Sequence, residues 1–270
     1  MIIDTHAHIG KLLSFRMTEK QVLYSMEKYG INFSLISNIE CVEFDHQGRA
    51  VPKILQKSQY KANKKAIDFA KAHPDKIGVL LWAKTFNENA DRDFIKLLEE
   101  NREFIYGLKL HPFHSRVAPD DPKMEQWYEL CRKYELPIVS HTGGCEEANS
   151  IHLYNAAKSH PDLNFVMVHM DLETDNKQAV DLLGKLPNLY GDTTWVKTET
   201  TVRAIKNCGS HKMLFGSDNP IDGKDTYLHN KTGDRSLYQE YFNELKTELS
   251  SDEYADLMYR NAQRLFKINI

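Results

Sequence analysis

Short apolar segments alternate with longer amphipathic segments along the whole chain, and this alternation limits the fold more than any other feature of the sequence. Strands separated by helices pair in parallel, and parallel strands covered on both faces are continuously apolar. The apolar segments have this character, so an α/β fold with a parallel sheet is expected. Eight segments are predicted to be strands: Ile2–His8, Asn32–Asn38, Ile77–Ala83, Phe104–His111, Pro137–His141, Asn164–His169, Leu189–Thr193 and Met213–Asp218.

A segment with a helical pattern follows each predicted strand. Near the C-terminus, Ser251-Asp252-Glu253 is typical of a helix start, so a further helix is expected at Tyr254–Phe266. The other predicted helices are Thr18–Tyr29, Ala62–Ala72, Asp91–Asn101, Pro122–Tyr134, Asn149–Ser159, Asn176–Gly184, Glu199–Asn207 and Leu237–Leu249.

Two architectures fit this order of elements, a closed (β/α)₈ TIM barrel and an open doubly wound sheet. No G-x-G-x-x-G motif follows a predicted strand, whereas polar residues fall at the C-terminal ends of the strands throughout. A TIM barrel builds its active site at that end, so we predict this fold. Barrels of this kind have about 250 residues, and a single domain over residues 1–270 is therefore expected.

Histidines gather at the ends of the predicted strands. Side chains alternate between the faces of a strand, so His6 and His8 share one face and can bind the same cation. An H-x-H pair alone is equally expected of ordinary strand-end histidines. The last predicted strand ends in Asp218, however, and imidazoles with a carboxylate around one barrel mouth suit zinc or another divalent metal. Of the 12 histidines, those at strand ends are His6, His8, His111, His141 and His169.

Several short motifs occur in order from residue 4 to residue 266. They are Asp4-Thr5-His6-Ala7-His8, Gly107-Leu108-Lys109-Leu110-His111-Pro112, Val139-Ser140-His141-Thr142-Gly143, His169, Phe215-Gly216-Ser217-Asp218-Asn219-Pro220 and Asn261-Ala262-Gln263-Arg264-Leu265-Phe266. In this order they resemble the amidohydrolase superfamily, in the branch that includes aminocarboxymuconate semialdehyde decarboxylase.

The resemblance implies that His6, His8, His141 and Asp218 bind a divalent metal, for which zinc is expected. It gives His169 either a second metal site or an acid-base and orienting role. Some members of the superfamily carry a carboxylated lysine that bridges two metals, and Lys109 stands at the matching position. We expect an unmodified Lys109 and one ion, with two ions if Lys109 is carboxylated.

This sequence departs from the resembled pattern after His169. The family often has His-Leu-Gly there, whereas this chain has His169-Met170-Asp171, followed by Leu172-Glu173. Two acids at this place are expected to alter the local charge or the substrate loop.

The expected activity is hydrolysis of a small substrate with an amide, lactone or related carbonyl bond by a metal-activated water. Asp218 would carry the proton from this water to the leaving group, and His169 would stabilise the oxyanion. One alternative is non-oxidative decarboxylation of an unsaturated or aromatic acid, with Asp218 or His169 protonating carbon. Another is a barrel that binds metal without catalysis, because a fold does not determine a function.

Further residues are candidates for substrate binding and support. Arg49 or Arg16 could hold a substrate carboxylate, although each is equally well explained as a solvated surface arginine. Asp4 could orient a ligand histidine from below. Trp82, Phe113 and Trp195 could form walls of the pocket or pack under loops. The predicted substrate-binding residues are Lys109, His111, Arg49 and Trp195.

Composition excludes several other classes of function. Lys plus Arg number 35 against 38 for Asp plus Glu, a net charge of −3 that favours neither a nucleic-acid nor a membrane partner. The four cysteines form no C-x-x-C pair and are expected to be reduced. No apolar run reaches about 18 residues, and no signal-peptide pattern is present, so a cytoplasmic protein is expected. The sequence is compatible with a homo-oligomer and does not fix the oligomeric state.

Overall fold

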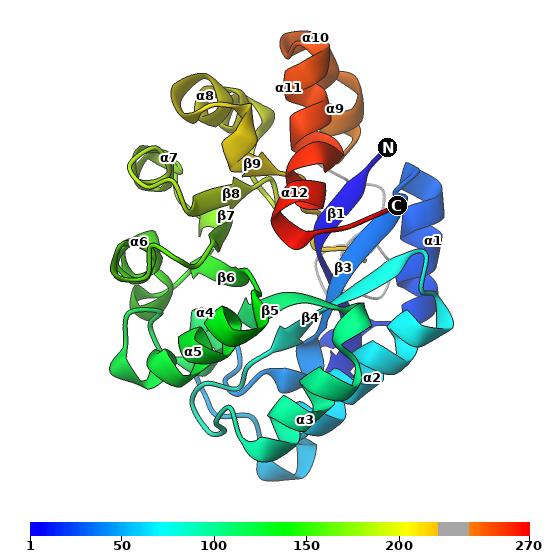
Figure 1. Cartoon of the computed structure of the whole chain (residues 1–270), viewed down its shortest axis with the longest axis vertical. Coiled ribbons are helices and arrows are strands. Elements are labelled where there is room, and N and C mark those ends of the chain that lie inside the picture. Colours follow the sequence, from blue (N-terminus) through cyan, green and yellow to red (C-terminus); the bar gives the residue numbers. More distant parts are fainter. Residues whose placement is uncertain (221–237) are drawn as a thin grey trace.

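The computed structural model describes residues 1–220 and 238–270, and its strands form one curved sheet ringed by helices (Figure 1). The strand order is β2-β1-β3-β4-β5-β6-β7-β8-β9, and every neighbouring pair from β1 to β9 is parallel. All eight predicted strands are present. They are β1 (Ile3–Leu12), β3 (Phe33–Asn38), β4 (Ile77–Trp82), β5 (Ile105–Leu110), β6 (Ile138–Gly143), β7 (Phe165–Leu172), β8 (Leu189–Asp192) and β9 (Met213–Leu214).

The segment that follows β9 returns to β1 and joins the two ends of the sheet. The backbone N–H of Thr5 donates to Phe215 O at 2.9 Å, and that of His8 donates to Asn219 O at 2.7 Å. A parallel bridge pairs Ala7 with Asn219. The predicted TIM barrel is therefore confirmed.

Helices cover the outside of the strands in chain order (Figure 1). Their starts follow local capping chemistry: Thr18 and Gln21 form a capping box at α1, and Asp91 accepts the N–H of Phe94 at α3. A short helix that the sequence did not predict, α4 (Pro112–Ser115), follows β5. The others are α1 (Glu19–Tyr29), α2 (Gln59–Ala72), α3 (Arg92–Glu100), α5 (Glu125–Tyr134), α6 (Ser150–Ser159), α7 (Lys177–Leu183) and α8 (Thr198–Cys208).

The C-terminal helices are shorter than predicted. The helix expected at 237–249 is divided into α9 (Tyr238–Asn243) and α10 (Leu245–Glu248), and Leu237 lies outside the described residues. The expected start near Ser251 is confirmed, because α11 (Ser251–Ala255) begins there with a capping box between Ser250 and Glu253. A π-helical turn at residues 256–260 then separates α11 from α12 (Asn261–Phe266).

Two apolar clusters position the rim of the barrel. Side chains from facing strands, such as Leu35, Val139 and Leu214, pack together with Phe266 of α12, so they fill the barrel interior. A smaller cluster lies under the loops and includes the unpredicted strand β2 (Phe15–Met17), which pairs antiparallel with β1. Trp82 at the end of β4 belongs to this cluster.

All four cysteines are free thiols, in agreement with the expected reduced state. In residues 1–220 and 238–270, no helix combines the length and the apolar character needed to cross a bilayer.

Candidate metal centre

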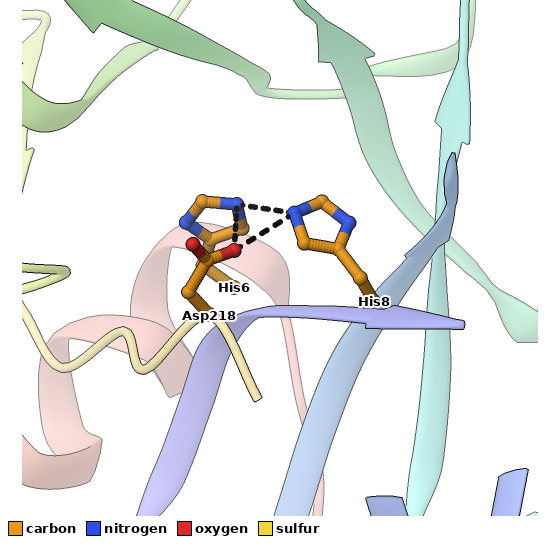
Figure 2. A group of neighbouring side chains, drawn as sticks. All are labelled: His6, His8 and Asp218. Atoms are coloured by element: carbon orange, nitrogen blue, oxygen red, sulfur yellow. Dashed lines mark hydrogen bonds and ion pairs between the residues drawn. The ribbon is translucent and has the colours of Figure 1, made fainter. Parts of the chain in front are cut away.

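His6, His8 and Asp218 meet at the end of the barrel where the parallel strands finish (Figure 2). The two Nε2 atoms lie 2.9 Å apart, and Oδ1 of Asp218 lies 3.1 Å from His8 Nε2 and 3.6 Å from His6 Nε2. Asp218 is held against β1 because its backbone N–H donates to His6 O at 2.7 Å. All three side chains are buried. The predicted pairing of the H-x-H motif with this carboxylate is therefore present in the fold.

The donor set fits a divalent cation. Two ligands bound to one zinc at about 2.1 Å in tetrahedral geometry lie about 3.4 Å apart. The three donor separations, 2.9, 3.1 and 3.6 Å, bracket this value. Two imidazoles with one carboxylate are also a ligand set that leaves room for substrate or water.

Neighbouring side chains contact the far nitrogens of both imidazoles. Nδ1 of His6 lies 3.2 Å from Thr194 Oγ1 and 3.5 Å from Asp192 Oδ2, and Nδ1 of His8 lies 2.9 Å from Ser37 Oγ. Such contacts orient ligand histidines with Nε2 toward the centre. We did not predict these residues, although Ser37 and Asp192 stand at the ends of predicted strands, the same signal that selected the histidines.

Lys109 is brought into the centre from β5. Its Nζ lies 2.9 Å from His6 Nε2, and the side chain is completely buried. Burial lowers the pKa of Lys109 to about 8, against the opposing influence of Asp218 and Asp192. The amine thus faces the same nitrogen that a metal would use.

Asp218 is surrounded by hydrogen-bond donors. Burial on its own would raise its pKa, but the His8 hydrogen bond and the nearby imidazoles of His6 and His169 hold the pKa well below its usual range. Oδ2 accepts the indole N–H of Trp195 at 3.0 Å. Trp195, predicted to bind substrate, is 40% exposed, and its polar atom is directed at Asp218.

His169 and His141 lie beside the three-residue group. The His169 ring is 5.4 Å from that of His6 and 4.7 Å from that of His141, and its Nδ1 donates to Thr194 O at 3.1 Å. Burial lowers the pKa of His169 to about 4, so its imidazole is neutral. Nε2 of His141 is directed at Gly143 O at 3.2 Å, and His141 is outside the group of three. Its place as a fourth ligand stays a prediction.

His111 extends the row of aromatic rings away from the centre. It stacks on His141 at 4.1 Å and on Trp82 at 5.1 Å, with interplanar angles of 16° and 11°. The Nδ1 atoms of His111 and His141 are buried and have no hydrogen-bond partner. Phe113 contacts this row, with its ring 5.9 Å from that of His141. Trp82 packs under the loops, one of its two expected places, and a role of Phe113 in the pocket wall stays a prediction.

The predicted arginines are not brought into the centre. Arg49 has a side chain that is 74% exposed and pairs with Asp45 at 2.8 Å, and Arg16 is also exposed. Arg116, which we did not predict, contacts an aromatic ring of this region: its guanidinium is 4.9 Å from the ring of Phe113. Arg116 comes five residues after His111, so the motif on the fourth predicted strand pointed to this region.

The residues after His169, where this sequence departs from the family pattern, have a structural role. His169, Met170 and Asp171 have left-handed φ angles of 66°, 50° and 66°. The carboxylate of Asp171 accepts the backbone N–H of Ser150 at 2.8 Å and its hydroxyl at 2.5 Å, at the start of α6. The carboxylate of Asp171 thus interacts with a helix N-terminus, and an effect of the two acids on the local charge or the substrate loop stays a prediction.

Asp4 supports the centre through the backbone. Its Oδ1 accepts the N–H of His6 at 3.1 Å and the N–H of Ser217 at 3.0 Å, and Oδ2 accepts the Ser217 hydroxyl. Burial raises the pKa of Asp4 to about 8. This side chain ties β1 to the segment that carries Asp218.

A cavity of about 610 Å³ lies elsewhere, at the opposite end of the barrel. Pro137, Asn164 and Tyr190, which lie at or near the starts of β6, β7 and β8, line it. Its charged walls are paired: Arg132 contacts Asp162 at 2.5 Å and Lys267 contacts Glu135 at 2.5 Å. The candidate active site is therefore placed at the buried group of His6, His8 and Asp218, and not at this cavity.

A family model described as "Amidohydrolase" matches residues 3–268. Among solved structures, 5-carboxyvanillate decarboxylase from Sphingomonas paucimobilis has 13% identity and a TM-score of 0.70, with 99% of each chain covered. A dihydroxybenzoic acid decarboxylase from Polaromonas with bound manganese and an inhibitor has 16% identity and a TM-score of 0.70, with 100% of this chain and 97% of that chain covered. A probable 2-pyrone-4,6-dicarboxylic acid hydrolase from Acinetobacter baumannii has 14% identity and a TM-score of 0.63, with 99% of each covered. No curated protein sequence matches this chain.

Proposed function

This chain belongs to the amidohydrolase family, as its motifs predicted, and we propose that it is a metal-dependent enzyme that hydrolyses a small carbonyl compound, such as an amide or a lactone. The observation that carries the proposal is the position of Asp218. One oxygen lies 3.1 Å from His8 Nε2 at the candidate metal position, while the other accepts the indole N–H of Trp195. A carboxylate held in this way is suited to accept a proton next to the reacting bond.

His6, His8 and Asp218 would hold the cation, with His141 as the proposed fourth ligand. A divalent cation there would polarise a carbonyl oxygen and lower the pKa of water. We propose zinc and a single ion, because the imidazole and carboxylate donors suit zinc. A second ion close by would need a bridging anion, and a Lys109 that is not carboxylated supplies none.

Asp218 would take the proton from the attacking water and pass it to the leaving group. His169 donates its Nδ1 hydrogen to Thr194 O, so the neutral ring has no Nε2 hydrogen with which to stabilise an oxyanion. We therefore give His169 a proton-accepting and orienting role, which differs from the role expected from the sequence. Lys109, whose pKa of about 8 keeps it mostly charged at neutral pH, would stabilise the oxyanion.

Decarboxylation is the second candidate, and the match to decarboxylases over 99% and 100% of this chain favours it. The stacked rings of Trp82, His111 and His141 lie beside the centre and make this side of it suited to an unsaturated or aromatic acid. In that reaction Lys109 would hold the substrate carboxylate, and Asp218 or His169 would first take up a proton from water and then deliver it to carbon.

The two reactions are separated by the source of the product oxygen. Metal-free protein is reloaded with zinc or manganese and incubated in heavy-oxygen water with a panel of carbonyl compounds and unsaturated acids. Heavy oxygen in the organic product supports hydrolysis. Release of carbon dioxide, with no heavy oxygen in the organic product, supports decarboxylation. Asp218→Asn should abolish turnover, and Asp68→Asn, at an exposed carboxylate on α2, should not. If the metal-loaded protein converts no compound of the panel, the third hypothesis is supported, a barrel that binds metal without catalysis.

A further inference from the structure

Thr194, just after β8, contacts two imidazoles of the centre from behind. Its Oγ1 lies 3.2 Å from His6 Nδ1, and its carbonyl oxygen lies 3.1 Å from His169 Nδ1. Thr194 is completely buried, so solvent does not compete for either contact. One residue thus meets the two rings on the side away from their Nε2 atoms.

The direction of the hydrogen bond to His6 is fixed by Asp192. A threonine hydroxyl has one hydrogen, and the hydroxyl of Thr194 donates it to Asp192 Oδ2 at 2.7 Å. The hydroxyl oxygen must then accept from His6, so Nδ1 of His6 carries the hydrogen and Nε2 carries the lone pair. The Lys109 contact agrees, because an ammonium can only donate to His6 Nε2.

The same two residues orient His169. A carbonyl oxygen only accepts, so His169 Nδ1 donates to Thr194 O, and its Nε2 carries a lone pair. Asp192 Oδ1 accepts the backbone N–H of His169 at 2.9 Å and that of Thr194 at 3.1 Å. The carboxylate therefore holds the donor and the acceptor of this hydrogen bond in place together.

We propose that Thr194 and Asp192 are positioning residues that fix the tautomers of His6 and His169, with both Nε2 lone pairs directed into the centre. His8 is held differently, because the Ser37 hydroxyl at its Nδ1 can either donate or accept. This inference rests on the proposed metal centre. A purely structural role for the pair would affect folding without affecting the tautomer of a histidine.

Two substitutions at residue 194 test the hydroxyl. Thr194→Val keeps the shape and the backbone carbonyl but removes the hydroxyl, whereas Thr194→Ser retains it. Thr201→Val is the matched control, because Thr201 is a buried threonine of α8. Its hydroxyl forms a hydrogen bond with Tyr241 Oη at 2.8 Å. Zinc affinity is measured by chelator competition, and histidine tautomers are read from side-chain nitrogen NMR of metal-free protein.

Thr194→Val should weaken zinc binding by about 10- to 100-fold and give mixed tautomers at His6. Thr194→Ser and Thr201→Val should keep the wild-type affinity and tautomers. Unchanged zinc affinity and unchanged His6 signals in folded Thr194→Val would overturn the inference.

Asp192→Asn gives an independent test, which also serves if Thr194→Val does not fold. The amide oxygen would replace Oδ1, which accepts two backbone N–H groups, and the amide N–H₂ would then donate to Thr194 Oγ1. The threonine hydroxyl would turn its hydrogen toward His6 Nδ1. The variant is therefore made together with Lys109→Met, which removes the ammonium that donates to His6 Nε2, and the His6 signals should then switch to the Nε2–H form. A variant that keeps the wild-type form contradicts the inference. Neither readout depends on turnover, and failure of the wild type to bind zinc would instead contradict the proposed function.

Discussion

The indole N–H of Trp195 donates to Oδ2 of Asp218 across 3.0 Å, and both residues have left-handed backbone angles, with φ of 58° and 64°. Such a conformation is rare for a tryptophan and persists only where the surroundings hold it. The turn after β8 thus directs the indole N–H of Trp195 at Asp218, a candidate metal ligand. One oxygen of Asp218 is occupied by the indole, which leaves the other facing the imidazoles.

Trp195→Phe should reduce turnover about tenfold, because a hydrogen bond to a charged group is lost at a half-exposed position. The zinc-dependent change in tryptophan fluorescence should also shrink. Steady-state kinetics and fluorescence titration measure the two effects. Trp127→Phe, in the core, should lower stability but leave zinc affinity unchanged. A Trp195→Phe variant with wild-type turnover would show that the indole does not orient Asp218.

Lys109→Met should bind one zinc more tightly, by about tenfold or more, while turnover falls. The lysine occupies the lone pair of His6 Nε2 at 2.9 Å and adds a positive charge that repels a cation. Lys84→Met is the matched control, since Lys84 is also buried but contacts Lys57 O and Glu88. Chelator competition gives the affinity.

Active wild-type protein should contain one equivalent of metal, with no mass added at Lys109. Elemental analysis and intact mass spectrometry measure these quantities. Two equivalents together with the mass of a carboxyl group on Lys109 would favour the bridged two-metal site and contradict the single-ion proposal.

Asp171→Ala should lower the free energy of unfolding by about 2 kcal/mol, because it removes a helix cap and puts alanine at a left-handed φ. Asp171→Asn should cost less than about 1 kcal/mol, since asparagine tolerates this conformation and can accept the Ser150 N–H. Urea unfolding of both variants gives the difference. Equal stability of the two would show that neither the cap nor the backbone angle matters.

Glu43 should make stability depend on pH between about 4.5 and 7. Burial raises its pKa from 4.5 to about 7, against the opposing N–H donors of Phe86 and Asn87. Through Glu43, the folded state then binds more protons than the unfolded state in this window, so the contribution of Glu43 to stability is greatest at the low end and falls as pH rises. The loss is about 3 kcal/mol at most.

Urea unfolding of metal-free protein across this pH window measures the slope of stability against pH, and Glu43→Gln should remove the downward contribution of Glu43 from it. Glu100→Gln, at an exposed glutamate, should retain it. If the slope is the same in Glu43→Gln and the wild type, Glu43 is not the titrating group.

The sequence was sufficient to predict what depends on local pattern. Hydrophobic periodicity located all eight parallel strands, and alternation along β1 placed His6 and His8 on one face. The hairpin partner β2 and the short helix α4 were missed because three or four residues carry too little pattern to detect.

Contacts between distant parts of the chain could not be predicted in the same way. Thr194 meets His6 across 188 positions, and no local pattern encodes which hydroxyl faces which ring. The role of Arg49 in substrate binding stays a prediction for a similar reason, since a place on a rim loop does not fix the direction of a long side chain, and here Arg49 pairs with Asp45. The position of a residue at a strand end was informative, whereas its contacts required the fold.

The hydrogen bond from the backbone N–H of Asp218 to His6 O joins segments 212 residues apart, and it forms only when the barrel closes. During synthesis, His6 and His8 leave the ribosome long before their carboxylate partner is translated. A nascent chain therefore presents only two of the three clustered donors. If these three residues hold the cation as proposed, the complete donor set forms only after residue 218 has been synthesised, and the ion would then bind the closed barrel more tightly than a shorter precursor. Supply of the cation in the cell would thus select fully closed molecules from incompletely folded ones.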